Sequence, residues 1–358
     1  MNSHTEIKKA IICKSVKEYT ISAAGIKHYI PKEGDVGIFE VLSIGKHKAI
    51  QGATGKNSYI FPGDHIMATF GNRYATNQFE GYVPTQVEET YQILGQGGCI
   101  GILKSTHAKF SKIGATELRL VGYAVNPQGQ VINTQYLTEE KISFKPEKKR
   151  PYQVILSVGS SMDSGKTTSA AYLCRGLKKG GHKVGFIKLT GTVYSRDKRF
   201  VQDCGADMAL DFSNLGFPST YMYELEEILS IYESLLTKLE AINPDYVVVE
   251  IADGLLQRET KMLLQHQPFM ATVDHIMLSC GDSLGVLSGL AFLHQIHRQP
   301  FAISGLINVS PLLVDEVRNT IELPVLDLQD LECPEVVQRL PQPQTRINGR
   351  LKLTSKVA

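Results

Sequence analysis

The segment from Gly159 to Thr168 constrains the fold of this chain more than any other feature. Its sequence is Gly-Ser-Ser-Met-Asp-Ser-Gly-Lys-Thr-Thr, and it stands between an apolar run, Val154–Val158, and a helix-like run, Ala170–Leu177. A strand, a loop of small residues and a helix that opens on Gly-Lys-Thr form the arrangement of a phosphate-binding loop, or P-loop. Backbone N–H groups in such a loop and in the first helical turn point at phosphate oxygens. The segment therefore predicts nucleotide binding.

The spacing of this motif departs from the usual one. Ser160 occupies the position of the first glycine and Gly159 stands one residue earlier, which gives Gly-x5-Gly-Lys-Thr. We expect Lys166 to contact the β- and γ-phosphates and the Thr167 hydroxyl to bind the Mg²⁺ between them. The predicted cofactor-binding residues of the loop and the first turn are Gly159, Ser161, Asp163, Ser164, Gly165, Lys166, Thr167 and Thr168. Serine- and glycine-rich turns are common, so the loop sequence alone does not identify a P-loop. The prediction depends on the strand-like and helix-like runs on either side of it.

Length and charge narrow the class of protein. A chain of 358 residues predicts two domains, and a net charge of +2 from 38 basic and 36 acidic residues gives no general attraction to nucleic acid or membranes. No apolar run reaches the ~18 residues of a membrane span, and the first residues lack the apolar core of a secretion signal. We expect a cytoplasmic protein whose six scattered cysteines are reduced thiols.

Hydrophobic periodicity divides the chain into two halves. Residues 1–143 read as short β-runs between turn signals and predict a small, mostly antiparallel barrel or sandwich. The charged, proline-containing segment 144–151 is interpreted as a linker. Residues 152–341 predict a doubly wound α/β domain with a mostly parallel sheet, and 342–358 a peripheral tail.

Individual elements are predicted from apolar runs and amphipathic stretches. The expected strands of the first half are 10–13, 36–44, 58–61, 65–70, 118–125 and 131–137. Those of the second half are 154–158, 184–189, 246–251, 275–279, 302–309 and 324–328, with helices at 224–239, 257–265, 283–296 and 312–321.

Three polar residues end predicted strands, where a nucleotide site on a parallel sheet is expected. Glu250 follows an apolar strand and is the candidate metal ligand, with Asp253 beside it; the alternative is an acid that caps the next turn. Lys188 interrupts a buried strand, and a buried ammonium needs an anion unless it reaches solvent from the strand end. Asn308 lies at the end of a later predicted strand, where its amide is suited to contact a purine.

Together these motifs resemble dethiobiotin synthetase, a member of the SIMIBI class of P-loop NTPases. The resemblance covers residues ~152–330 and depends mainly on the P-loop, Val249-Glu250-x-x-x-Gly254-Leu255 and Gly305-Leu-Ile-Asn308. It implies ATP and Mg²⁺ as cofactors, with Thr167 and Glu250 on the metal and Asn308 on the base. Lys166, Lys188 and Asp253 are the implied catalytic residues. The second metal acid of the family is assigned to Asp207, with Asp203 as the alternative.

The same comparison shows departures from that family. Its usual Val-Glu-Gly-Ala-Gly-Gly is replaced by Val249-Glu-Ile-Ala-Asp253-Gly254, so a carboxylate stands where the substrate wall is expected. Nothing in dethiobiotin synthetase corresponds to residues 1–140. Partitioning ATPases of the class carry an extra lysine early in the loop, whereas this chain has Ser160-Ser161-Met162.

The first half contains its own candidate ligand site. Residues 71–82 place Arg73 among three amides, an acid and three aromatic residues, which suits either ligand binding or a loop that satisfies its own backbone. The glycine cluster 95–101 predicts a tight turn rather than a dinucleotide site. Three sparse lysines, Lys46, Lys48 and Lys56, give only a weak signal for single-stranded nucleic acid.

The sequence as a whole predicts an ATP-dependent enzyme. We expect it to activate a small-molecule carboxylate or carbamate by phosphoryl transfer, as a ligase-like or kinase-like enzyme that accepts a carboxylate or amine substrate. The alternative is a nucleotide-gated regulatory ATPase whose N-terminal barrel binds a protein, a metabolite or single-stranded nucleic acid. Analogy with the class predicts a homodimer.

Overall fold

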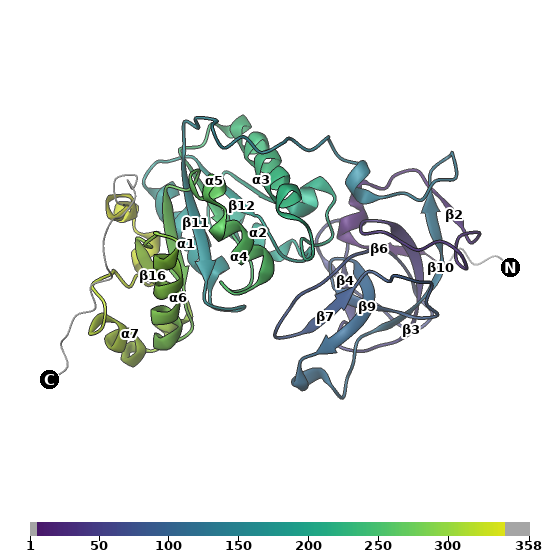
Figure 1. Cartoon of the computed structure of the whole chain (residues 1–358). Coiled ribbons are helices and arrows are strands. Elements are labelled where there is room, and N and C mark those ends of the chain that lie inside the picture. The colour runs from purple at the N-terminus through teal and green to yellow at the C-terminus, as the bar shows by residue number, and fades with distance from the viewer. Residues whose placement is uncertain (1–5, 341–358) are drawn as a thin grey trace. The chain divides into compact units, whose positions relative to one another are not determined.

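The computed structural model describes residues 6–340, which belong to two compact units (Figure 1). Unit 1 contains the chain up to Lys141 and two later segments, Gly191–Arg196 and Phe212–Tyr223. Unit 2 contains the rest of the chain from Ile142 onward. The sequence predicts a continuous second domain, whereas in the structure these two later segments belong to unit 1. The predicted tail, 342–358, lies outside the described residues.

Unit 1 is built from short strands. They are β1 (Ile7–Lys9), β2 (Thr20–Ser22), β3 (Val36–Ser43), β4 (Ala49–Gln51), β5 (Asn57–Tyr59), β6 (His65–Phe70), β7 (Phe79–Tyr82), β8 (Tyr91–Gly95), β9 (Cys99–Thr106) and β10 (Glu117–Val125). Four 3-10 helices accompany them: η1 (Ile11–Ser15), η2 (Ala108–Phe110), η3 (Thr134–Tyr136) and η4 (Phe212–Leu215).

Five of these strands pair in a closed circuit. Strand β3 pairs with β6 and β10, β8 pairs with β10 and β9, and β9 pairs with β6. Inside it, Phe70 packs edge-on against Phe39 and Tyr91, with ring centroids 5.4 Å apart in both pairs. Each fully buried ring of this kind contributes roughly 1.5–3 kcal/mol through burial alone.

Two predicted strands of unit 1 are wrong. Residues 10–13 enter η1, because a short buried apolar run looks the same in a strand and in a helical turn. Residues 131–137 contain one bridge at Val131 followed by η3, whose first turn is capped by the Asn133 side chain. The predicted tight turn at 95–101 is confirmed, since it joins β8 to β9.

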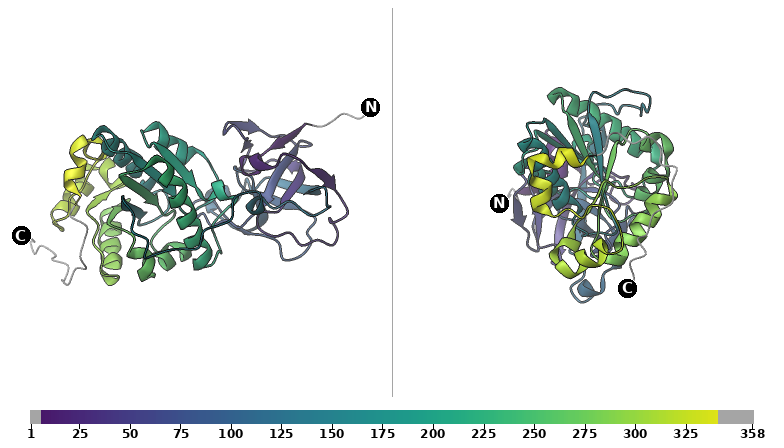
Figure 2. Two further views of the ribbon diagram at one scale, coloured as in Figure 1. Left: turned by 90° about the horizontal axis from the view of Figure 1, so that it is seen from above. Right: turned by 90° about the vertical axis from the view of Figure 1, so that its left-hand side faces the viewer.

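Unit 2 has a six-stranded parallel sheet with helices on both faces (Figure 2). Its strands are β11 (Gln153–Gly159), β12 (Val184–Lys188), β13 (Met208–Asp211), β14 (Tyr246–Glu250), β15 (His275–Ser279) and β16 (Ala302–Ser304), in the order β13-β12-β14-β11-β15-β16. Its helices are α1 (Lys166–Lys179), α2 (Arg196–Asp203), α3 (Leu225–Leu239), α4 (Arg258–Gln265), α5 (Gln267–Met270), α6 (Ser283–Gln295), α7 (Pro311–Arg318) and α8 (Leu328–Glu332), with η5 (Glu240–Ile242), η6 (Leu306–Val309) and η7 (Pro334–Arg339). The α/β prediction is therefore correct for this unit.

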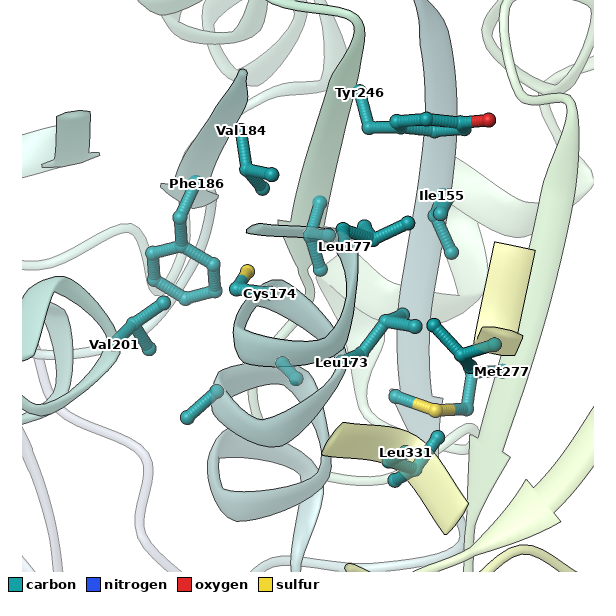
Figure 3. Close-up of a cluster of buried hydrophobic side chains, with 14 of the residues drawn as sticks. Ile155, Leu173, Cys174, Leu177, Val184, Phe186, Val201, Tyr246, Met277 and Leu331 are labelled. Atoms are coloured by element: carbon teal, nitrogen blue, oxygen red, sulfur yellow. The ribbon is translucent and has the colours of Figure 1, made fainter. Parts of the chain in front are cut away.

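Helix α1 lies over the middle of the sheet and carries the core of one face. Its buried side chains Leu173, Cys174 and Leu177 meet Ile155 and Phe186 from the strands (Figure 3). On the other face, a methyl group added to Gly185 would meet Leu239 of α3 at 2.7 Å, and one added to Gly289 of α6 would meet Leu278 at 2.8 Å. The sheet is buried on both faces, as its near-continuous apolar strands predict.

The strand predictions fail at one end of this sheet. Strand β16 stops at Ser304, since Gly305 (φ +100°) turns the chain into η6. Residues 324–328 contribute only a bridge between Val325 and Ile303 before α8 begins. Strand β13 was not predicted, because only one of its four residues, Asp211, is buried and its apolar signal is weak.

The predicted linker, 144–151, packs against helix α3. Lys145 donates its backbone N–H to Glu233 Oε2 at 3.2 Å, and Lys148 pairs at 2.6 Å with Glu240, the residue that caps the end of α3. Arg150 Nη2 lies 2.7 Å from Glu233 Oε2, and both side chains are buried. This segment is a fixed part of unit 2 rather than a free connection, because a buried charge pair holds it in place.

Candidate active site

The P-loop connects the end of β11 to the start of α1. A methyl group on Gly159 would lie 2.2 Å from Ser164 Oγ, so the loop folds back closely over the strand end and only glycine fits there. Gly165 caps α1 at φ +95°, and a methyl group there would meet the Gly305 Cα at 2.9 Å. Asp163 also has a positive φ, +61°. These left-handed residues accommodate the extra loop residue between strand and helix.

Lys166 opens α1 with its ammonium held by the loop itself. Its Nζ donates to Ser161 O at 2.7 Å and lies 3.4 Å from Ser164 Oγ, and the residue is only 6% exposed. Burial lowers the pKa of Lys166 and outweighs the attraction of Glu250 and Asp253. An anion bound in the loop would favour the charged ammonium, which is what a phosphate supplies.

Thr167 and Glu250 meet at the carboxyl end of the sheet. Thr167 Oγ1 donates to Glu250 Oε1 at 3.0 Å, although 83 residues separate them along the chain. Glu250 is 1% exposed, and its Oε2 has no hydrogen-bond partner among the described residues. A buried carboxylate oxygen without a partner is costly. A hydroxyl, a carboxylate oxygen and nucleotide phosphates suit Mg²⁺, which takes few protein ligands and keeps water.

Lys188 extends the site along the sheet. Four neighbouring strands, β13, β12, β14 and β11, place one residue each in register: Asp211, Lys188, Glu250 and Ser157. Lys188 Nζ lies 3.3 Å from Glu250 Oε1 and forms a charged hydrogen bond to Asp197. Burial by itself would lower the pKa of Lys188, but Asp197 and Glu250 raise it above its ordinary value. The lysine is therefore a permanent cation between two carboxylates, and the alternative in which it reaches solvent is wrong because its side chain is 14% exposed.

Asp197 is a site residue that the sequence analysis missed. It lies in the first turn of α2, nine residues after Lys188, within a strongly charged stretch that resembles a solvated helix face. The buried ammonium of Lys188 was itself the signal, since it requires a protein carboxylate as well as any bound anion.

The assignment of Asp207 to the metal site is wrong. Its Oδ1 lies 2.5 Å from Lys178 Nζ and its Oδ2 accepts the Val184 N–H at 2.9 Å. Val184 begins β12, so Asp207 stands at the amino end of the sheet, whereas the P-loop lies at the carboxyl end. The alternative, Asp203, ends α2, and Asp197 in its first turn is the acid that pairs with Lys188.

The remaining predicted residues border the loop. Gly254, next to Asp253 (φ +61°), packs so tightly that a methyl group on it would approach Ser160 O at 2.7 Å. Asn308 lies in η6 and donates to Leu326 O at 2.9 Å, and the neighbouring Leu306 N–H donates to Ser164 O at 3.0 Å. Thr168 lies in the first turn of α1. The β14 and β16 loops thus adjoin the P-loop, as the sequence predicts.

Two features are absent from the described part of the chain. Among residues 6–340, no three or more His, Cys, Asp or Glu side chains gather to hold a metal ion by themselves. Within the same residues, no helix has both the length and the apolar character for a membrane crossing.

Comparison with known proteins finds similar solved structures at low TM-scores. No family profile matches the chain, and no curated protein does. Similar solved structures include the signal recognition particle 54 kDa protein from Aeropyrum pernix K1 in complex with GDP (22% identity, 45% of this chain and 37% of that one, TM-score 0.34). Another is the signal recognition particle receptor FtsY from Elizabethkingia anophelis in complex with GDP (14% identity, 50% of this chain and 57% of that one, TM-score 0.32). A third is the hydrogenase maturation factor HypB from Archaeoglobus fulgidus (12% identity, 50% of this chain and 83% of that one, TM-score 0.34). The chain spans less than two thirds of the first two.

Proposed function

We propose that this protein is a Mg²⁺-dependent P-loop NTPase of the SIMIBI class. The observation that carries the proposal is the hydrogen bond between Thr167 and Glu250, next to a buried Lys166 that the loop itself holds. The proposal is supported by the meeting, at one sheet edge, of residues that belong to two motifs far apart in the sequence. The glycine positions that shape the loop support the same conclusion.

We further propose ATP as the nucleotide and a carboxylate or carbamate as the phosphoryl acceptor. An acceptor oxygen would attack the γ-phosphorus as the bond to the β,γ-bridging oxygen breaks, which releases ADP and forms an acyl or carbamoyl phosphate. Lys166 and Lys188 would neutralise charge on the transferred group, and Asp253 would orient the acceptor. Thr167 and Glu250 would hold Mg²⁺, with Asp197 in place of Asp207 as the second acid, and the ion would supply charge that polarises the phosphates. Asn308 would contact the base.

Calorimetry tests the nucleotide assignment. Titrating the full chain with ATP, GTP, ADP and GDP, with and without Mg²⁺, should give saturable heat for ATP that requires Mg²⁺. Thr167→Ala and Glu250→Gln should weaken the effect of Mg²⁺, while Lys183→Met, an exposed control, should not. Binding of GTP alone would overturn the choice of ATP, and no heat with any of the four would overturn the whole proposal.

One observation favours the second candidate, a nucleotide-gated regulatory ATPase. The chain leaves unit 2 after Thr190, contributes Gly191–Arg196 to unit 1, and returns at Asp197, the partner of Lys188. We propose that unit 1 is a small barrel that responds to the nucleotide through this segment. Hydrogen exchange in Gly191–Arg196 should then change with bound nucleotide, and a protein partner rather than a small acid should stimulate hydrolysis.

The homodimer remains a proposal with one supporting feature. Leu256 and Leu284 are 82% and 73% exposed, on segments whose neighbours Gly254 and Gly285 border Ser160 of the P-loop. A second copy would cover these side chains. Light scattering should report a dimer for the natural chain and a monomer for Leu256→Ser, and a natural chain that is monomeric with nucleotide would exclude it.

A further inference from the structure

Lys46 of unit 1 is a half-buried cation that forms no ion pair among the described residues. It follows strand β3, and its ammonium lies 5.6 Å from the centroid of Phe79 and 5.2 Å from that of Phe110. Its hydrogen-bond acceptor is the side-chain oxygen of Gln78. The same oxygen accepts from Arg73 Nη2 at 2.8 Å. Two positively charged side chains thus converge on one neutral oxygen.

Two other cations, Arg73 and Lys109, lie near Lys46. Burial, and after it the nearby charges of Arg73 and Lys109, lower the pKa of Lys46 to about 7. His47 is buried beside them, and its pKa is lowered well below the ordinary value by burial and then by Lys46 and Arg73. Its Nε2 lies 3.1 Å from Leu94 O, which also accepts from Arg73. A bound anion would favour the charged form of Lys46, whose half-buried ammonium has cations as its charged neighbours.

We propose that Lys46, Arg73 and Gln78 form a binding site for the carboxylate group of a small molecule. A carboxylate oxygen would replace the Gln78 amide oxygen as the acceptor that Lys46 and Arg73 share, and it would bring the negative charge that the amide lacks. The partly exposed ring of Phe110 and the buried ring of Phe79 provide an apolar wall for the rest of the ligand.

A carboxylate suits this place better than a phosphate. Lys46 and Arg73 both donate to the sp² oxygen of the planar Gln78 amide, and a carboxylate oxygen is also sp² and lies in a planar group. A monoanion with an apolar body also loses less hydration than a phosphate dianion on entering a site between aromatic rings. The site lies within unit 1 and does not depend on the proposed nucleotide chemistry.

Calorimetry with sodium benzoate on the full chain tests the site. We expect saturable binding near pH 7, at least ten-fold weaker in Lys46→Met and unchanged in Lys48→Met, an exposed lysine two residues away. Benzamide, the neutral analogue, should not bind. Equal binding to Lys46→Met, or no saturable binding of benzoate at millimolar concentration, would overturn the proposal, and tighter binding of inorganic phosphate would overturn the choice of carboxylate.

A second variant keeps the test decisive if Lys46→Met does not fold. Gln78→Glu places a carboxylate within the cluster itself, so it should raise the melting temperature and abolish benzoate binding. Gln128→Glu, in an exposed turn, is the matched control and should do neither. A Gln78→Glu protein that melts no higher than the natural chain and still binds benzoate would contradict the proposal. Titrating the same samples with ATP shows whether the nucleotide site works, so a failure of the carboxylate site can be told apart from a failure of the nucleotide site.

Discussion

Lys188 joins the two acids of the candidate active site. Its ammonium lies between Asp197 and Glu250, and Glu250 in turn accepts the hydrogen bond of Thr167. Removal of this lysine would leave the buried carboxylate of Glu250 without its cation and next to the partly exposed Asp197. One residue therefore influences both the stability of unit 2 and the orientation of the proposed metal ligands.

We predict that Lys188→Met destabilises the protein and abolishes nucleotide hydrolysis. The expected loss in the free energy of unfolding is about 3–5 kcal/mol, as for a broken buried ion pair. Urea unfolding and a phosphate-release assay measure the two effects, with Lys183→Met as the exposed control. Full turnover together with unchanged stability in Lys188→Met would show that the lysine has neither role.

Lys46 predicts a pH dependence of stability. Its pKa is about 7 in the folded protein, whereas the ordinary value is 10.5. Between these values the unfolded chain binds a proton that the folded chain does not, so stability should rise as pH increases from about 7 towards 10. Below pH 7 both states are protonated and the destabilisation is fully present. Urea unfolding from pH 6.5 to 9.5 should show this rise in the natural chain and in Lys48→Met but a smaller one in Lys46→Met; equal slopes would contradict the assignment.

The P-loop is the element whose backbone geometry matters most. Gly165 combines a positive φ with close approach to Gly305, so its replacement causes both strain and a steric clash. Gly181, after α1, also has a positive φ (+88°), but a methyl group there would meet nothing within 4 Å. Comparing alanine substitutions at Gly165 and Gly181 therefore separates the loss of stability due to backbone strain from the loss due to the steric clash.

We predict that Gly165→Ala lowers stability more than Gly181→Ala does. The control should lose about 1 kcal/mol from strain alone, and Gly165→Ala should lose more and bind nucleotide at least ten-fold more weakly. Thermal unfolding and nucleotide calorimetry measure these effects. If the two variants behave alike, the loop does not need the close approach to Gly305.

The elements that the sequence predicts correctly are those with a strong local signal. Strands β11, β12, β14 and β15 are near-continuous apolar runs, and they carry the P-loop, Lys188 and Glu250 to one edge of the sheet. Local signals fail where tertiary partners decide, as in β13, where three residues are only partly buried and the apolar pattern is weak. Asp197 was missed for the same reason: its role comes from Lys188, which approaches it only after folding.

At the scale of the whole molecule, the chain alternates between the two units. It changes unit after residues 141, 190, 196, 211 and 223. The two segments returned to unit 1 are bound there: Ser195 N–H donates to Gln51 Oε1 at 2.8 Å, and Thr134 Oγ1 donates to Gly216 O at 2.6 Å. Unit 1 is therefore incomplete without residues that follow the P-loop in sequence.

We predict that a fragment of residues 1–143 is unstable. It would lack Phe217 and the other buried residues of Phe212–Tyr223, and it would leave Gln51 and Thr134 without their partners. Its amide NMR spectrum should lack the dispersion of a folded domain, or its melting temperature should fall below that of the full chain. A fragment as stable as the intact protein would show that the returned segments contribute little.

This alternation limits how a gene for such a protein can be rearranged. A recombination event could exchange everything after residue 151 for another nucleotide-binding sequence. It would then also discard Gly191–Arg196 and Phe212–Tyr223, which are part of unit 1. The two halves are expected to be inherited together and to change in concert, unlike modules that are shuffled freely between unrelated proteins.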